Sequence, residues 1–357
     1  MINKIWIRIP VTFVLMFLII SQVKSQELIW SDEFNVDGRI DSEKWHHQTL
    51  LPNGSSWYNG EIQHYTDRIE NSYVSNGTLK IMAIRENYTQ QGITKEFTSA
   101  RLNSKFAFTY GRVEISARLP MGIGTWPALW TLGQNITEPG GYFAEDFGTT
   151  PWPACGEIDI MEHWGSNQNY ILSATHTPSS YGGTVNAGGR YIDNVSNQFH
   201  LYSLDWDEDK LTFAVDNQIH YVYEPSQQNW ETWPFDLNQY LLLNVAILPE
   251  IIPTGFTQDA MEIDYVRVYQ YNLNDVSLDT ADKIKIAPIP TNDIIRISGI
   301  KTSTIYSILD YSGIILKKGL LNSNNHSINL TDLSTGMYFL QLNNKDGYII
   351  TEKIIVK

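Results

Sequence analysis

The sequence has little of what stabilises small exported proteins or binds nucleic acid. Its single cysteine, Cys155, cannot form an intrachain disulfide, so packing or a metal ion would have to stabilise an exported fold. Lys and Arg number 25 against 39 Asp and Glu, which argues against nucleic acid as a ligand because that binding depends on basic contacts to phosphates. Charged residues make up 18% and hydrophobic residues 42% of the 357, which excludes disordered, collagen-like and coiled-coil chains.

The N-terminus lacks an apolar run long enough for a comfortable membrane span. Residues 9–20 are apolar, but the uncharged stretch between Arg8 and Lys24 contains Pro10 and is short for a span of about 20 residues. A positively charged start before an apolar segment of this length is typical of an export signal. We therefore predict a signal peptide over residues 1–25 and no membrane span in the mature protein.

Charge and tryptophan are unevenly distributed. The net charge is −14, of which residues 1–25 carry +3 and residues 276–357 carry +2, which leaves −19 on residues 26–275. Ten of the eleven tryptophans lie between Trp30 and Trp233, and none follows. Both shifts predict a domain boundary near residue 273. The expected organisation is a signal peptide over 1–25, a catalytic domain over 26–272, a linker over 273–285 and a C-terminal domain over 286–357.

A long segment with helical periodicity is also absent. Instead, hydrophobic and polar residues alternate in short runs separated by turns rich in Gly, Asn and Pro. Such alternation, with one side of each strand facing a core, is typical of a β-sandwich or jelly roll. The clearest of these runs are residues 78–84, 111–118, 211–215 and 263–269.

Three carboxylates are concentrated within six residues. On a regular strand, Glu157 and Asp159 project from one face, whereas Glu162 points the opposite way. A β-bulge at residues 160–161 would absorb one residue and return Glu162 to the face of the other two. Three acids in one groove are costly because like charges repel. The spacing therefore predicts that these carboxyl groups have a functional role that offsets this cost.

Retaining glycoside hydrolysis fits this arrangement. It needs two carboxyl groups about 5–5.5 Å apart, one attacking the anomeric carbon and the other donating and later accepting a proton. A carboxyl group between them can tune both pKa values. Two other interpretations stay open at this point, an exposed acidic strand face and a calcium site.

The stretch 157–162 resembles the catalytic signature of glycoside hydrolase family 16 in its bulged, laminarinase-type form. The resemblance implies a β-jelly roll with a concave groove that cleaves internal β-glucan bonds with retention. It implies Glu157 as nucleophile, Glu162 as acid/base and Asp159 as the assisting carboxylate. Further matching motifs are LIWSDEF at 28–34, EIQHYTDR at 61–68, TSARL at 98–102, YGRVE at 110–114, WPALW at 126–130 and IDYVRVY at 263–269.

The resemblance also suggests groove residues. Aromatic rings stack on the apolar faces of sugars, although each tryptophan could instead pack in the core. Two positions depart from the family pattern: residues 59–61 read Asn-Gly-Glu, and residues 243–250 lack the usual glycines and tryptophan. The second departure weakens any transfer of linkage preference. The predicted substrate-binding residues are Trp57, Asn59, Glu61, Trp126, Trp130, Trp152 and His176.

No cofactor is expected for catalysis, but the family pattern suggests a structural Ca²⁺. Its predicted ligands are Glu33, the carbonyl of Gly77 and Asp264, since carboxylate and carbonyl oxygens suit this ion. Turn acids without an ion are the alternative. The acidity of residues 26–275 favours a neutral glucan over sulfated polymers.

The C-terminal 286–357 resembles a sorting domain of type IX secretion. A carbohydrate-binding module is the rival interpretation, but a segment without tryptophan has few rings on which sugars could stack. The matching pieces are APIPTN at 287–292, YSILDYSG at 306–313, LTDLSTGMYFL at 330–340 and KIIVK at 353–357.

The sequence thus predicts a secreted or cell-surface, monomeric endo-β-glucanase acting on β-1,3 or mixed β-1,3/1,4 glucan with retention. Its expected partners are a neutral β-glucan and the secretion machinery. Another neutral-polysaccharide hydrolase, a transglycosylase and a non-catalytic glucan-binding protein are the alternatives. Linkage preference, occupancy of the metal site and removal of the tail stay open.

Overall fold

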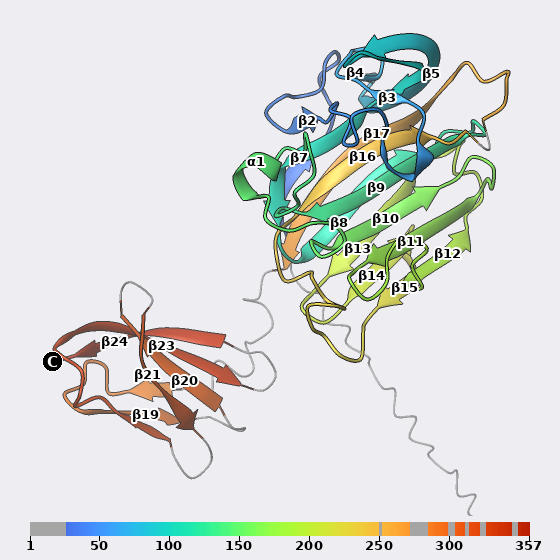
Figure 1. Ribbon diagram of the computed structural model, residues 1–357. Coiled ribbons are helices and arrows are strands. Elements are labelled where there is room, and N and C mark those ends of the chain that lie inside the picture. Colours follow the sequence, from blue (N-terminus) through green and yellow to red (C-terminus); the bar gives the residue numbers. More distant parts are fainter. Residues whose placement is uncertain are drawn as a thin grey trace, which may run out of the picture. The chain divides into compact units, whose positions relative to one another are not determined.

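The computed structural model describes residues 26–249, 252–271, 285–298, 304–310, 314–321, 326–344 and 349–357. Residues Gln26–Tyr271 form one compact unit, and the described residues from Lys285 onward belong to another (Figure 1). The predicted signal peptide and almost all of the predicted linker lie outside the described residues.

Two antiparallel sheets build the larger unit. The first has the strand order β15-β14-β13-β8-β17-β5-β6-β3, with β1 paired to β17 and β4 paired to β5; the single parallel pair among these strands is β3 with β6. Its strands are β1 (Gln26–Asp32), β3 (His64–Tyr65), β4 (Ser72–Ser75), β5 (Thr78–Gln90), β6 (Ile93–Ser99), β8 (Gly111–Arg118), β13 (His200–Trp206), β14 (Leu211–Val215), β15 (Gln218–Tyr223) and β17 (Gln258–Tyr271).

The second sheet has the order β12-β11-β10-β9-β16-β7-β2 and lies against the first (Figure 1). Two short helical segments, η1 (Tyr58–Gly60) and α1 (Ala144–Phe147), lie in loops. The strands of this sheet are β2 (Trp45–His47), β7 (Arg101–Phe108), β9 (Thr125–Gly133), β10 (Glu157–His163), β11 (Tyr170–His176), β12 (Ala187–Tyr191) and β16 (Gln239–Ile247).

A core of apolar side chains from both sheets fills the space between them. Ile115 of β8 and Val266 of β17 face Leu129 of β9 and Leu243 of β16, and all four are fully buried. Burial of this much apolar surface is the main stabilising contribution to the fold. The predicted all-β sandwich is confirmed. The predicted strands 111–118 and 211–215 coincide with β8 and β14, while 78–84 and 263–269 lie within the longer β5 and β17.

The C-terminal unit contains two smaller sheets around its own core. Ile297, Ile328, Leu340 and Ile354 are among the buried residues, and they come from both sheets. One sheet has the order β18-β19-β22 and the other β21-β20-β23-β24. Their strands are β18 (Lys285–Ala287), β19 (Ile294–Ser298), β20 (Thr304–Leu309), β21 (Ile315–Leu321), β22 (Ser327–Asn329), β23 (Gly336–Asn344) and β24 (Ile349–Val356).

In the part of the chain that the structure describes, no helix is long and apolar enough to cross a membrane.

Candidate active site

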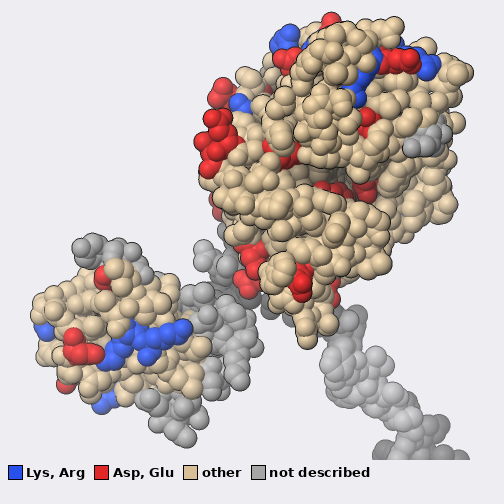
Figure 2. All heavy atoms as spheres, viewed as in Figure 1, with Lys and Arg blue, Asp and Glu red and all other residues tan. Residues whose placement is uncertain are grey.

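A cleft of about 860 Å³ lies on the outer face of the second sheet. Strands β9, β10, β11 and β16 form its floor, and loops around residues 58–61, 136–139 and 182–184 contribute to its walls. Acidic atoms lie at the bottom of the hollow visible on the larger unit in Figure 2. The cleft therefore offers a groove lined with aromatic rings around a small acidic patch. The rings that line it are Tyr58, Trp126, Trp130, Trp152 and Trp164.

The predicted bulge in β10 is confirmed. Against β11, Asp159 pairs with Ala174 and Glu162 pairs with Leu172, so three steps along β10 match two along β11. The ladder with β9 shifts in the same region. Since one extra residue reverses the alternation, Glu162 returns to the face of Glu157 and Asp159, and all three line the cleft. The two residues within the bulge, Ile160 and Met161, are both buried.

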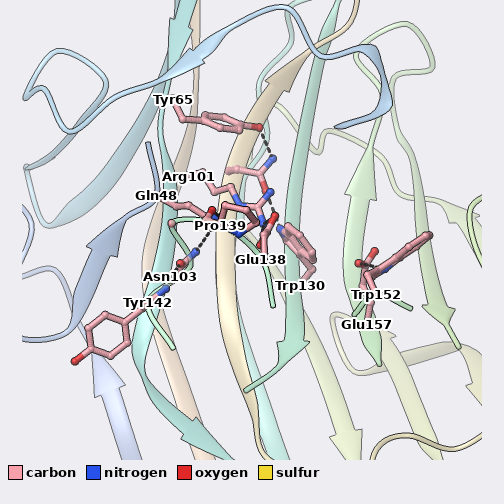
Figure 3. Close-up of polar contacts among 12 residues, drawn as sticks. Gln48, Tyr65, Arg101, Asn103, Trp130, Glu138, Pro139, Tyr142, Trp152 and Glu157 are labelled. Atoms are coloured by element: carbon pink, nitrogen blue, oxygen red, sulfur yellow. Dashed lines mark hydrogen bonds and ion pairs between the residues drawn. The ribbon is translucent and has the colours of Figure 1, made fainter. Parts of the chain in front are cut away.

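Indole groups orient the two glutamates. Trp152 Nε1–H donates a hydrogen bond to Glu157 Oε2 over 2.8 Å, a contact drawn in Figure 3. Trp126 Nε1–H donates to Glu162 Oε1 over 3.1 Å. Trp164 stacks on Trp126, with ring centroids 5.6 Å apart and planes 20° apart. Rings that could contact a sugar therefore also fix the carboxyl groups that would react with it.

His176 lies beside the other carboxyl groups. Its Nε2 is 3.2 Å from Asp159 Oδ2 and 3.6 Å from Glu157 Oε1. The backbone N–H of Gly182 donates to Nδ1 over 3.1 Å, so Nδ1 carries no proton and the neutral ring keeps its proton on Nε2. A metal ion would need the lone pair of that Nε2. The arrangement therefore suits a hydrogen-bond donor to the carboxylates better than a metal ligand.

Burial shifts the titration of all three carboxyl groups. Burial raises the pKa of Asp159 to about 8. Burial and the charge of Asp159 raise the pKa of Glu162 to about 8, against smaller lowering effects of His176 and Trp126. Burial and Asp159 also raise the pKa of Glu157 well above its ordinary value. A negative charge on Glu157 at neutral pH thus depends on protons that Asp159 and Glu162 retain.

Residues 59–267 match the family described as glycosyl hydrolases family 16. This chain belongs to family 16. It is 38% identical to a β-glucanase of Rhodothermus marinus, over 69% of this chain and 85% of the relative. Its fold is similar to the crystal structure of LamAcat from Zobellia galactanivorans, with a TM-score of 0.64 and 50% identity, over 68% of this chain and 97% of that one. A second structure from that organism, LamA_E269S in complex with laminaritriose and laminaritetraose, has a TM-score of 0.64 and 49% identity, over 68% and 98% of the two chains.

The tail of this family 16 glycoside hydrolase matches a second family. Residues 285–357 match the secretion system C-terminal sorting domain. This match confirms the prediction of a sorting domain and of an exported, extracellular or cell-surface enzyme. The prediction that catalysis needs no cofactor agrees with the family, whose reaction requires carboxyl groups.

The raised pKa values predict how activity and stability depend on pH. With Glu162 in the acid/base role that the resemblance implies, it must hold a proton, and we expect kcat/KM to fall as pH rises through about 8, where its carboxyl group ionises. The folded state also keeps a proton on Asp159 that the unfolded chain releases near its ordinary pKa of 3.8, so raising the pH from 4 to 8 lowers the free energy of unfolding. Asp159→Asn should therefore lose activity. It should also be more stable than the wild type at pH 8, with a Tm higher by about 2–4 °C for each kcal/mol of ionisation cost that the amide removes.

Thermal unfolding scans from pH 4 to pH 9 test this expectation. The matched control is Asp146→Asn in α1, because Asp146 is exposed and lies outside the cleft. Equal pH slopes of Tm for wild type and Asp159→Asn would contradict a cost of ionising Asp159.

Most of the predicted substrate residues line the cleft. Asn59, Trp126, Trp130, Trp152 and His176 do so. Glu61 also lines it, although this side chain is largely buried.

One residue was predicted wrongly. Trp57 is 2% exposed and packs edge-on against Tyr65, with ring centroids 4.7 Å apart. It does not line the cleft, so it has no free face for a sugar ring. Trp57 instead packs in a small cluster with Leu51 and Tyr65, next to η1, and this packing removes its ring from solvent.

A polar network holds the Trp130 ring in the cleft. Trp130 Nε1–H donates to Asn244 Oδ1 over 2.7 Å, Asn244 Nδ2–H donates to the Tyr65 hydroxyl over 3.1 Å, and that hydroxyl donates to Glu61 Oε2 over 2.9 Å. The Arg101 guanidinium lies 4.8 Å from the Trp130 ring centroid. Figure 3 shows Tyr65 of β3, Arg101 of β7 and Trp130 of β9 close together. A ring held by its Nε1–H and by the guanidinium over one face loses little entropy when a sugar stacks on it.

A buried ion pair that no sequence motif indicates lies beside the Trp130 ring. Arg101 donates to both carboxylate oxygens of Glu138, over 2.9 and 2.7 Å, and both residues line the cleft (Figure 3). The loop that carries Glu138 is fastened further by Gln48, which donates to the Pro139 carbonyl, and by Asn103, which accepts from the Tyr142 N–H. The two charged residues are 37 positions apart, so no local pattern could have paired them.

One of the predicted calcium ligands, Glu33, already has a cationic partner in the structure. Both carboxylate oxygens of Glu33 accept hydrogen bonds from Arg267, over 2.9 and 2.7 Å, which lowers the pKa of Glu33. The turn around Gly77 is contacted by the ammonium group of Lys80, which donates to the carbonyls of Ser75 and Thr78. Arg267 thus already neutralises Glu33, and the ammonium group of Lys80 occupies the turn beside the Gly77 carbonyl. As arranged, the residues do not fit a Ca²⁺ ion, and Asp264 is exposed.

We accordingly expect chelation to leave the stability of the enzyme unchanged. The expected Tm in EDTA is that in excess Ca²⁺, because Arg267 neutralises Glu33 without an ion. Differential scanning calorimetry in the two buffers measures this directly. A Tm that falls in EDTA and recovers with Ca²⁺ would instead support the original prediction of an ion at Glu33, Gly77 and Asp264.

Proposed function

We propose that this protein is an exported endo-acting β-glucanase that hydrolyses internal bonds of β-1,3 or mixed β-1,3/1,4 glucan with retention. The observation that carries the proposal is the bulge of β10, which places Glu157, Asp159 and Glu162 together in one aromatic cleft. An acidic strand face without chemistry would need no bulge and no indole donors. A groove that runs along a sheet also suits cleavage inside a polymer.

Each carboxyl group has a role that its surroundings support. Glu157 attacks the anomeric carbon, because Trp152 and the Nε2–H of His176 stabilise its negative charge. Glu162, whose pKa is raised to about 8, donates its proton to the leaving oxygen and later accepts one from water. Asp159 holds a proton between them and limits the negative charge that burial would otherwise penalise.

The charge of the cleft supports a neutral substrate. Among the described residues that line it, Arg101 is the one Lys or Arg, and Glu138 already neutralises it at 2.7 Å. A sulfated or uronate-rich polymer would therefore meet carboxyl groups without a basic partner. The names of two relatives point to a glucan, since one is a β-glucanase and another was crystallised with laminaritriose and laminaritetraose, whereas a third, 32% identical, is named a keratan-sulfate endo-1,4-β-galactosidase.

Product analysis tests the substrate and the mode of attack. The purified enzyme is incubated with laminarin, lichenan, barley β-glucan, agarose and carrageenan, and the products are sized over time. We expect oligosaccharides of intermediate length to appear first from laminarin or a mixed-linkage glucan. Cleavage of carrageenan or agarose alone would overturn the proposed substrate, and release of glucose alone would overturn endo action.

Two alternatives remain within the same cleft. A transglycosylase would use the same glycosyl-enzyme intermediate but transfer it to a sugar hydroxyl, so its products would include chains longer than the substrate. A non-catalytic glucan-binding protein would bind laminarin without releasing reducing ends. We further propose that the enzyme is a monomer that the secretion machinery recognises through the C-terminal domain, and light scattering of the purified chain tests its oligomeric state.

A further inference from the structure

The bulge of β10 directs a backbone carbonyl into the core. Ile160, inside the bulge, is 2% exposed, and its carbonyl oxygen accepts a hydrogen bond from Ser173 Oγ over 2.7 Å. Ser173 is fully buried on β11, between Leu172 and Ala174, which both line the cleft. By strand alternation the serine faces away from the cleft, so it cannot contact the substrate.

A histidine of the opposite sheet completes the contact. His220 of β15 has its Nε2 2.9 Å from Ser173 Oγ. The hydroxyl has one proton, which it gives to the Ile160 carbonyl, so Nε2 must carry the proton that Ser173 accepts. Burial, aided by Arg190, lowers the pKa of His220 to about 4, which keeps the ring neutral in this role at working pH.

We propose that Ser173 and His220 are positioning residues for catalysis: their hydrogen-bond chain from β15 to the Ile160 carbonyl holds the bulge that brings Glu162 into the cleft. This inference rests on the proposed function, in which Glu162 is the acid/base. These hydrogen bonds affect Glu162 only through the backbone of β10, because they end at the Ile160 carbonyl. A one-residue change in register reverses every following side chain, so a regular ladder at this point would point Glu162 into the core.

Neither Ser173 nor His220 is among the groups that face Glu162. Trp126 of β9 donates to its carboxyl group, Glu157 and Asp159 lie beside it on β10, and His176 of β11 contributes a weaker electrostatic effect. A change at Ser173 should therefore alter the position of Glu162 without removing any of these partners. Loss of the serine hydroxyl leaves a buried carbonyl and a histidine N–H without their partner, an arrangement that favours relaxation of the bulge.

Ser173→Ala tests the proposal in the full-length enzyme. We expect kcat on laminarin to fall about 10- to 100-fold with little change in KM, since a displacement of a reacting group by about 1 Å is enough for such a loss. The basic limb of the pH profile should move, because the burial and the neighbouring charges that set the pKa of Glu162 change with its position. Ser173→Thr keeps the hydroxyl and should restore much of kcat and the basic limb.

A second pair of variants keeps the test decisive where Ser173→Ala does not fold. His220→Gln can still donate an N–H to Ser173 and should resemble the wild type, whereas His220→Leu should lower kcat and move the basic limb. Wild-type kcat and pH profile in Ser173→Ala, or equal profiles in the two His220 variants, would overturn the proposal even with a lower Tm. A wild-type enzyme that cleaves no glucan would instead refute the proposed function.

Discussion

Glu157→Gln is expected to lower kcat on laminarin by about 10⁴-fold or more, as loss of the nucleophile does in covalent catalysis. The variant should fold normally, with a Tm at pH 7 equal to or above that of the wild type. The reason is that burial and the charge of Asp159 raise the pKa of Glu157, so its ionised form costs stability that a neutral amide does not. Reducing-sugar release and calorimetry measure the two effects.

Chemical rescue separates the roles of the two glutamates. With an activated aryl β-glucoside of a laminari-oligosaccharide, azide should restore turnover of Glu157→Ala and give the α-azide, because azide then attacks from the face that the nucleophile has left. Rescue of Glu162→Ala should give the β-azide, since Glu157 still forms the intermediate. The matched control is Glu145→Gln in α1, where the side chain is exposed. Unchanged hydrolysis by Glu157→Gln would refute the mechanism.

Arg101→Met is expected to cause the largest loss of stability among single changes around the cleft. It would leave the buried carboxylate of Glu138 without its partner, and breaking a buried ion pair on one side typically costs about 3–5 kcal/mol. For a domain of this size that corresponds to a decrease of about 6–20 °C in Tm. The KM for laminarin should rise as well, because Arg101 also contacts the Trp130 ring.

A double variant and a change of pH distinguish this origin from loss of packing. Arg101→Met with Glu138→Met should recover much of the Tm, because two apolar side chains need no partner. Arg101 also lowers the pKa of buried Glu61, so its loss raises that pKa further, and the variant should lose more stability at pH 8 than at pH 5. A double variant no more stable than Arg101→Met would mean that the ion pair is not the cause.

The shared face of the three carboxyl groups could be predicted because their arrangement follows from counting residues along one strand. Side chains alternate on a strand, so the interval from Asp159 to Glu162 requires an extra residue if both face the cleft, and the ladders to β9 and β11 contain it. The strands of the larger sheets could be predicted for the same reason. Local alternation carries the information, and the sandwich follows from the need to cover each apolar face.

The surroundings of those carboxylates depend on contacts that no local pattern encodes. Arg101 meets Glu138 across a loop, and His220 reaches Ser173 from the opposite sheet. Trp57 illustrates the same limit. The local sequence around a loop tryptophan is the same whether its ring packs on Tyr65 or lines a groove. In each case, the packing of the two sheets and their loops decides which groups become neighbours.

The reactivity of Cys155 can report local opening of the segment that precedes β10. The thiol is 1% exposed in a small cluster with Leu132 and Tyr240, two residues before Glu157, and burial raises its pKa so that the reactive thiolate is suppressed. Since Cys155 is the one cysteine of the chain, a maleimide can label the protein at a single place. The rate of labelling then measures how often the segment before β10 separates from β16. We expect a glucan bound in the cleft to lower this rate.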